Sequence, residues 1–132
     1  MADARDILGT VFKDGSATLL ARVAGANAVN IVQADIASIK YTVYLLDEDD
    51  EDSQTAIVGH IDVALIVASI IYNTLQTDAR WSKDATGYNF AHVLDVSTDE
   101  AFAVAGQSYR VIYELTPTSG QAILVRFVAR VI

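Results

Sequence analysis

The sequence predicts an all-β protein, built as an antiparallel β-sandwich with one short helix or helical turn. The first observation is that apolar and polar residues alternate with a period of two in three runs near the end of the chain. The second is that turn signals divide the chain into seven or so short strands. Such alternation is typical of strands that bury one face. The apolar faces are Tyr88, Phe90, His92 and Leu94; Tyr109, Val111, Tyr113 and Leu115; and Ile123, Val125, Phe127, Ala129 and Val131.

The second of these runs begins as a late strand of an immunoglobulin-like sandwich does. Its opening is Ala105-Gly106-Gln107-Ser108-Tyr109. In such domains a corner tyrosine buries its ring and ties its hydroxyl to nearby backbone. We therefore interpret Tyr109 as a corner tyrosine and expect an immunoglobulin-like sandwich. The predicted core is Tyr41, Val43, Phe90, Tyr109, Val111, Tyr113, Val125 and Phe127.

Earlier elements follow from local signals. Asp14-Gly15 between Ile7–Phe12 and Ala17–Val23 predicts a β-hairpin. Residues 33–38 predict a helical turn, and residues 39–46 a strand with Ile39, Tyr41, Val43 and Leu45 on one face.

The middle of the chain changes period. Residues 56–66 predict one or two strands interrupted near Gly59-His60, whereas residues 67–75 have helical spacing with Ser69 as a cap. A loop that contains Trp81 then leads into the last strands. Residues 116–120 predict the turn of the final hairpin.

The length of 132 residues predicts a single domain, residues 1–132, with residues 1–7 as an N-terminal arm. The chain has no Cys, which excludes disulfides and thiolate metal sites. We find no signal peptide, and the longest apolar stretch, residues 63–72, is shorter than the roughly 20 residues of a membrane span. These features predict a soluble protein that binds no membrane.

The net charge of −8 is concentrated in one segment. Six of the 17 acidic residues form the run 47–52, and the other 11 nearly balance the 9 basic residues. Nucleic-acid binding needs a concentrated basic face, so this class of partner is excluded. The hydrophobic fraction of 52 % is high for so small a domain, which favours an obligate assembly that covers apolar surface.

The acidic run invites comparison with a calcium loop. Asp47, Asp49 and Glu51 have part of the EF-hand spacing. However, Asp52 stands at the sixth position, which needs Gly, and Val58 at the twelfth, which needs Glu. We interpret the run as an exposed, self-repelling loop, and a divalent-ion contact within an assembly stays open.

No pattern in the sequence indicates catalysis. His60 and His92 lack a metal-binding spacing; His92 falls on an apolar face, and His60 is expected to share a strand face with Asp62. Nucleophile elbows, phosphate loops and paired carboxylates in an apolar setting are absent. We therefore expect a non-enzymatic protein without a cofactor or metal. Trp81 and Tyr88 are either a loop anchor, which we favour, or a stacking platform for carbohydrate.

The last strand carries the candidate interface. Leu124, Val128 and Ile132 lie opposite the core-facing residues, on a face shared with Arg126 and Arg130. An apolar terminal strand with an unpaired edge invites other chains. We therefore predict that these five residues, with the N-terminal arm, are covered by a neighbouring molecule.

Several segments carry a family resemblance. Residues 75–81, 86–92 and 109–120 resemble small proteins encoded among the structural genes of tailed phages, and residues 33–39 are similar to the lead-in of their central strand. The resemblance covers roughly residues 30–130. The chain is also similar to the N-terminal domains of phage upper-baseplate proteins. The resemblance implies a virion component with a β-sandwich fold that binds other virion proteins.

The leading hypothesis is a capsid decoration (cement) protein that binds and stabilises the capsid shell. It would be made in the host cytoplasm, contact the major capsid protein and form a dimer or trimer, with many weak contacts adding up on the shell. The alternative is a neck, tail or baseplate component. An alternative of another class is a carbohydrate-binding or adhesion module that uses Trp81 and Tyr88.

Overall fold

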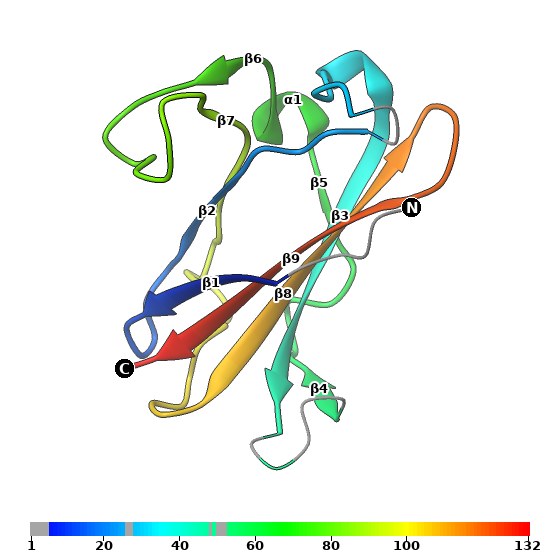
Figure 1. Ribbon diagram of the computed structural model, residues 1–132. Coiled ribbons are helices and arrows are strands. Elements are labelled where there is room, and N and C mark those ends of the chain that lie inside the picture. Colours follow the sequence, from blue (N-terminus) through cyan, green and yellow to red (C-terminus); the bar gives the residue numbers. More distant parts are fainter. Residues whose placement is uncertain (1–5, 26–27, 48, 50–52) are drawn as a thin grey trace.

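A computed structural model describes residues 6–25, 28–47, 49 and 53–132 of the chain. Two β-sheets pack face to face, with one 3-10 turn and one short α-helix at the end of the sandwich drawn at the top of Figure 1. The prediction of an all-β sandwich is confirmed. Residues 1–5 of the expected arm lie outside the described residues. Asp6 and Ile7 belong instead to the first strand.

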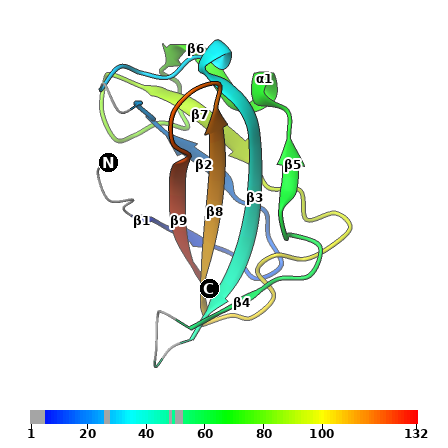
Figure 2. The same cartoon turned by 90° about the vertical axis from the view of Figure 1, so that its right-hand side faces the viewer.

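The larger sheet contains six strands, of which β9, β8, β3 and β5 lie side by side in Figure 2. Its path is β1-β9-β8-β3-β4, and β5 also pairs with β3. All pairs are antiparallel except β1 with β9, so the prediction of a purely antiparallel sandwich is wrong for this pair. Parallel strands need a long connection, and here most of the domain supplies it. The strands are β1 (Asp6–Val11), β3 (Ile36–Leu46), β4 (Gln54–Ala56), β5 (Val63–Leu65), β8 (Ser108–Pro117) and β9 (Ile123–Val131).

The smaller sheet contains three antiparallel strands in the order β2-β7-β6. They are β2 (Thr18–Ala21), β6 (Ile71–Gln76) and β7 (Tyr88–Val93), and the helical elements are η1 (Gln33–Asp35) and α1 (Val67–Ile70). The three final strands are found where the sequence predicts them. The helical turn predicted over residues 33–38 is confirmed only for residues 33–35, because β3 already begins at Ile36.

The predicted hairpin around Asp14-Gly15 does not form a paired hairpin. The Gly15 N–H does donate to the Phe12 carbonyl at 2.9 Å, so the turn itself exists. However, β1 and β2 belong to different sheets. The Asp14 N–H donates to the carbonyl of Phe102 at 2.8 Å, which fixes the turn across the end of the sandwich. The dipeptide encodes a reversal of the chain and does not encode which sheet receives each arm.

The predicted helix over residues 67–75 is mostly wrong. Only Val67–Ile70 is helical, and the chain continues as the strand Ile71–Gln76. Ser69 is not the cap; Ile66 is the N-cap residue, without a side-chain cap bond. A four-residue helix is too short to be stable alone. The β-branched and aromatic residues after it gain more by pairing with β7, where Ile71 is buried opposite Phe90.

All eight predicted core residues are buried. Phe90 from the smaller sheet meets two rings of the larger sheet, with centroid distances of 4.8 Å to Tyr113 and 6.2 Å to Phe127. Tyr109 is buried as expected, and its hydroxyl oxygen accepts a hydrogen bond from the Val104 N–H at 3.1 Å. The aromatic rings therefore join the two layers at the centre of the sandwich.

Candidate functional site

The outward surface of the larger sheet is the broadest candidate interface. Strand register aligns Lys40, Glu114 and Leu124 in one row and Tyr44, Arg110 and Val128 in another, with Ile112 beside Arg126 between them. We call this surface the outer face. Its residues are Lys40, Tyr44, Arg110, Ile112, Glu114, Leu124, Arg126, Val128 and Arg130.

The outer face is basic although the protein is acidic. It carries four of the nine Lys and Arg residues of the chain, namely Lys40, Arg110, Arg126 and Arg130. The Lys40 ammonium lies 3.7 Å from a carboxylate oxygen of Asp62 and 3.7 Å from one of Glu114. These pairs are about half exposed, so each contributes little to stability. Aliphatic side chains beside arginines are suited to a protein partner rather than to a solvated surface.

The predicted interface residues lie where the alternation puts them. Leu124 is 42 % exposed and Ile132 56 % exposed, whereas the neighbouring Val125 and Val131 are buried. The expectation of an unpaired last strand is wrong, because β1 pairs with β9 along six residues. On this side of the larger sheet the edge strand is therefore β1. The interface role of Leu124, Arg126, Val128, Arg130 and Ile132 stays a prediction.

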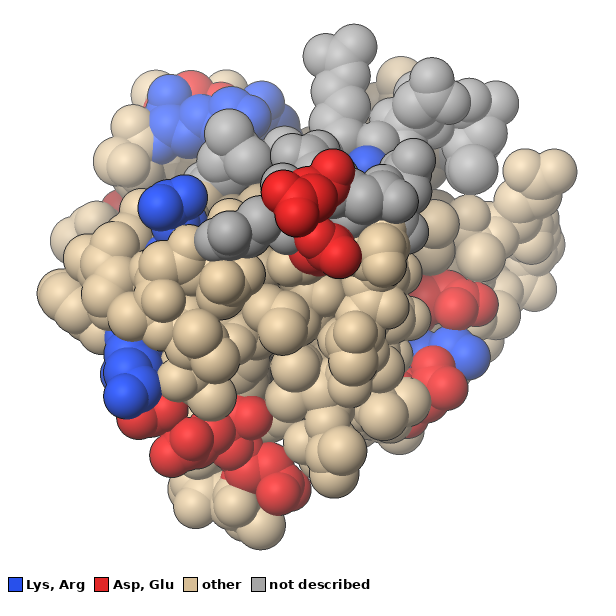
Figure 3. All heavy atoms as spheres, turned by 90° about the horizontal axis from the view of Figure 1, so that it is seen from below, with Lys and Arg blue, Asp and Glu red and all other residues tan. Residues whose placement is uncertain are grey.

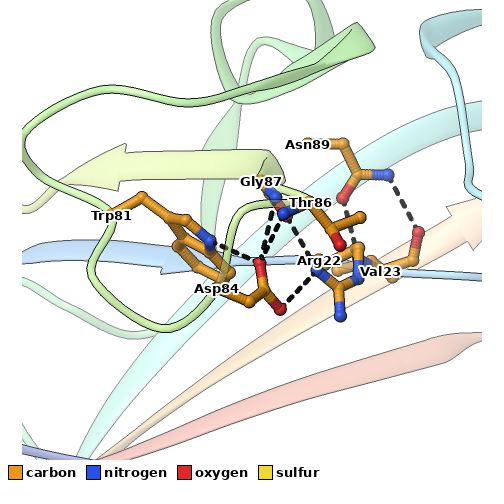
Figure 4. A network of polar contacts seen from close by, with 7 residues as sticks. All are labelled: Arg22, Val23, Trp81, Asp84, Thr86, Gly87 and Asn89. Atoms are coloured by element: carbon orange, nitrogen blue, oxygen red, sulfur yellow. Dashed lines mark hydrogen bonds and ion pairs between the residues drawn. The ribbon is translucent and has the colours of Figure 1, made fainter.

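The loop before β7 is held by the carboxylate of Asp84 (Figure 4). Its Oδ1 accepts hydrogen bonds from the Trp81 Nε1 at 2.9 Å and from the Thr86 and Gly87 N–H groups. Its Oδ2 lies 2.8 Å from the Arg22 guanidinium. The pKa of Asp84 lies well below its usual range. The largest cause is the hydrogen bond from Trp81, and the next are those from the Gly87 N–H and from Arg22. One side chain thus ties the loop to the end of β2.

Tyr88 has its own polar partners. Its ring is buried and packs against the ring of Trp81, with 5.6 Å between the ring centroids. Its hydroxyl donates to Asp78 Oδ2 at 2.6 Å. Burial raises the pKa of Tyr88, and the hydrogen bond to Asp78 adds to this. The same hydrogen bond lowers the pKa of Asp78. Two rings that pack on each other favour the loop-anchor interpretation over a carbohydrate platform.

We predict that Asp84→Ala loosens this corner without unfolding the core. Trp81 is the single Trp of the chain, so its emission reports the change directly. The expected result is a red-shifted Trp81 emission and a lower melting temperature, because three donors and Arg22 lose their acceptor. Asp99→Ala, which removes an exposed carboxylate from another loop, is the control. An unchanged emission spectrum in Asp84→Ala would contradict the assignment.

The two histidines lie inside the sandwich. His60 Nε2 is 2.7 Å from the Asp99 carbonyl, which only accepts, so this nitrogen carries the proton. In the neutral ring, Nδ1 of His60 then accepts from the Tyr41 hydroxyl at 2.8 Å. His60 does not share a strand face with Asp62 as expected, because it is buried in the connection between β4 and β5 and Asp62 is exposed.

His92 is buried on the core-facing side of β7, as its alternation predicts. Its Nδ1 lies 2.6 Å from the Tyr113 hydroxyl. Burial, followed by the nearby charge of His60, lowers the pKa of His92 to about 4. His92 is therefore neutral at pH 7.

The acidic run is described only in part. Glu48 and residues 50–52 lie outside the described residues, and the question of a divalent ion falls on them. The Asp49 N–H donates to Asp47 Oδ1 at 2.9 Å. Figure 3 shows acidic side chains in separate clusters on this end of the molecule, with basic side chains beside some of them and uncharged surface between. Among the described residues, no three His, Cys, Asp or Glu side chains come together to hold a metal ion.

No helix in the described part of the chain is long and apolar enough to span a membrane. Comparison of the chain with family models, with curated proteins and with solved structures gives no match. Function must therefore be argued from the surfaces of the molecule.

Sequence reasoning missed the polar anchors. The Asp84–Arg22 pair joins residues 62 positions apart, which no local pattern reveals. Buried Asn89 likewise bonds the Val23 N–H at 2.7 Å and the carbonyls of Val23 and Ile31. An available signal was the Asp84-Ala85-Thr86-Gly87 segment, since Asp side chains commonly accept from N–H groups two residues on.

Proposed function

We propose that this protein is a non-enzymatic structural component of a phage virion, and specifically a capsid decoration protein. In this role it binds the major capsid protein through the outer face and stabilises the shell. The observation that carries the proposal is the outer face itself, a sheet surface with exposed or half-buried aliphatic side chains and four cations on an acidic protein. The resemblance of residues 30–130 to small virion proteins supports the choice of partner.

The physical logic is that of many weak contacts. A surface of one sheet buries too little area for a tight isolated complex, but copies on a rigid lattice add their contacts. Arginines next to aliphatic groups suit a partner patch with carboxylates, because their guanidinium groups bind carboxylates in a bidentate way. Self-association into a dimer or trimer would bring more outer faces to the shell.

The double variant Val128→Asp with Ile132→Asp tests the surface. Val128 is half-buried on the outer face within β9, and Ile132 is exposed directly after the strand, so the fold should persist. We expect attachment to particles, or self-association, to weaken by about tenfold or more, because the new carboxylates replace aliphatic contacts and repel the carboxylates of the partner patch. Attachment is measured by co-sedimentation with particles that lack the protein, and self-association by light scattering.

The matched control is Val58→Asp with Val93→Asp. Val58 is 81 % exposed in the connection between β4 and β5, and Val93 is 58 % exposed on β7 of the smaller sheet, so this pair should behave as the parent. Parent-like attachment of the Val128→Asp, Ile132→Asp protein would show that the outer face is not the interface.

Copy number separates the decoration role from a place in the neck, tail or baseplate. A shell component is present on the order of hundreds of times per particle, whereas a neck or baseplate component occurs about a dozen times. Quantitative mass spectrometry of purified particles measures this ratio directly. A measured number of about a dozen copies per particle would contradict the decoration role and would assign the protein to the neck, tail or baseplate.

A further inference from the structure

Strand β1 is the one long, regular edge in the described part of the molecule. The other edge strands are short or irregular: β4 and β5 have three residues each, β2 has four, and β6 changes register between Ile71 and Gln76. β1 pairs with β9 over six residues without a bulge, and it contains neither Lys nor Pro. Natural sheets protect exposed edges with such devices. β1 lacks them.

The main-chain groups on this edge can be assigned. The Ile132 N–H donates to the Val11 carbonyl at 2.9 Å, so the main chain of Val11 faces the β9 side. Main-chain groups of successive strand residues point to alternate sides. The N–H and C=O groups of Leu8 and Thr10 therefore point away from the sheet. Two donors and two acceptors are thus presented at the edge.

A groove runs beside this edge. It has a volume of about 560 Å³ and lies between β1 and β2, the two blue strands that diverge from their connecting turn in Figure 1. Gly9 keeps it open, because no atom lies within 4 Å of the position that a Cβ would take there. Half-buried Trp81 forms part of the far wall. Alternate side chains of an added strand would enter this groove.

The charge of the groove selects the partner. Its charged lining residues are Arg22, Arg80 and Lys83, and no Asp or Glu is among the described lining residues. Arg22 and Arg80 are already paired, with Asp84 and Asp78. Lys83 is exposed and forms no ion pair with the described residues. A carboxylate on the incoming strand would complement it.

We propose that β1 is a strand-addition site for an extended, acidic segment of a partner protein. The segment hydrogen-bonds to the main chain of Leu8 and Thr10, and its alternate side chains occupy the groove beside Gly9 with a carboxylate near Lys83. Main-chain bonds supply the affinity in this mode of recognition, and the groove supplies the specificity. The site is separate from the outer face, so it extends the proposed function and can fail independently of it.

The probe is a fluorescein-labelled heptapeptide that alternates Val with Glu, compared with the same peptide carrying Lys in place of Glu. Fluorescence polarisation should give a Kd below about 1 mM for the acidic peptide and at least about tenfold weaker binding of the basic one. Gly9→Leu fills the groove, and Thr10→Pro removes an outward N–H. Each should weaken binding of the acidic peptide by at least about tenfold.

Lys83→Glu should reverse the preference between the two peptides, whereas Lys13→Glu, the same charge change outside the groove, should not. Melting temperatures confirm that each variant is folded. If Thr10→Pro is unfolded, the comparison of Gly9→Leu with the parent alone tests the proposal. No binding of the acidic peptide at about 1 mM, or equal binding by parent and Gly9→Leu, overturns the proposal. A parent dimer that Thr10→Pro converts to monomer also overturns it, because the edge then receives a second copy.

Discussion

Phe90→Ala should reduce the free energy of unfolding by about 3–5 kcal/mol, the usual loss for a buried Phe. Phe90 is fully buried, and its ring packs against both Tyr113 and Phe127 of the larger sheet. Truncation would leave a cavity between two layers that are held apart by their other side chains. Urea denaturation followed by circular dichroism measures the loss.

Val93→Ala is the matched control on the same strand. Val93 is 58 % exposed, so its truncation should change stability by about 0.5 kcal/mol or less. A larger loss in Val93→Ala than in Phe90→Ala would show that the faces of β7 are inverted, since a slip of one residue exchanges the faces of a strand.

Acidification should destabilise the protein through His92. The pKa of His92 is about 4 in the folded state and about 6.5 in the unfolded chain, so the unfolded state binds the proton more tightly. Stability is therefore complete above pH 6.5 and is lost as the pH falls from 6.5 towards 4. The difference of about 2.5 between the two pKa values corresponds to about 3 kcal/mol of the free energy of unfolding.

The measurement compares unfolding free energies at pH 7 and pH 4 for the parent and for His92→Gln. Carboxylates also titrate in this range. The contribution of His92 is therefore the difference between the losses of unfolding free energy in the two proteins. The parent should lose about 3 kcal/mol more than the variant. Equal losses would contradict the assignment to His92. A loss that disappears in His60→Gln instead would assign the effect to the other buried ring.

The features that the sequence predicted best are those that depend only on the alternation of apolar and polar residues along a strand. The strands β7, β8 and β9 and all eight core residues were predicted from alternation. In β8 and β9 period two reports the buried face directly, whereas β7 is buried on both faces along most of its length. The orientation of Leu124 and Arg126 on the outer face follows from the same rule. These features need no knowledge of distant parts of the chain.

Features that depend on distant contacts were not predicted. The parallel pairing of Asp6–Val11 with β9 brings together segments more than a hundred residues apart. Residues 67–75 show helical spacing, yet pairing with β7 takes Ile71 into a strand. The groove beside Gly9 arises because β1 and β2 belong to different sheets, whereas Asp14-Gly15 predicted that they would pair. In each case a local pattern competes with a tertiary contact that it does not encode.

The parallel pairing of β1 with β9 has a mechanical consequence. Asp6 is aligned with Arg126 and Val11 with Val131, so β1 begins at one end of the pair and β9 finishes at the other. A force applied before Asp6 and after Val131 therefore pulls the two strands past each other lengthwise. All the hydrogen bonds of the ladder then share the load, whereas an antiparallel pair of terminal strands would open one bond at a time. The arrangement suits a domain that is held at both ends under tension, where the rate of forced unfolding decides how long the fold survives.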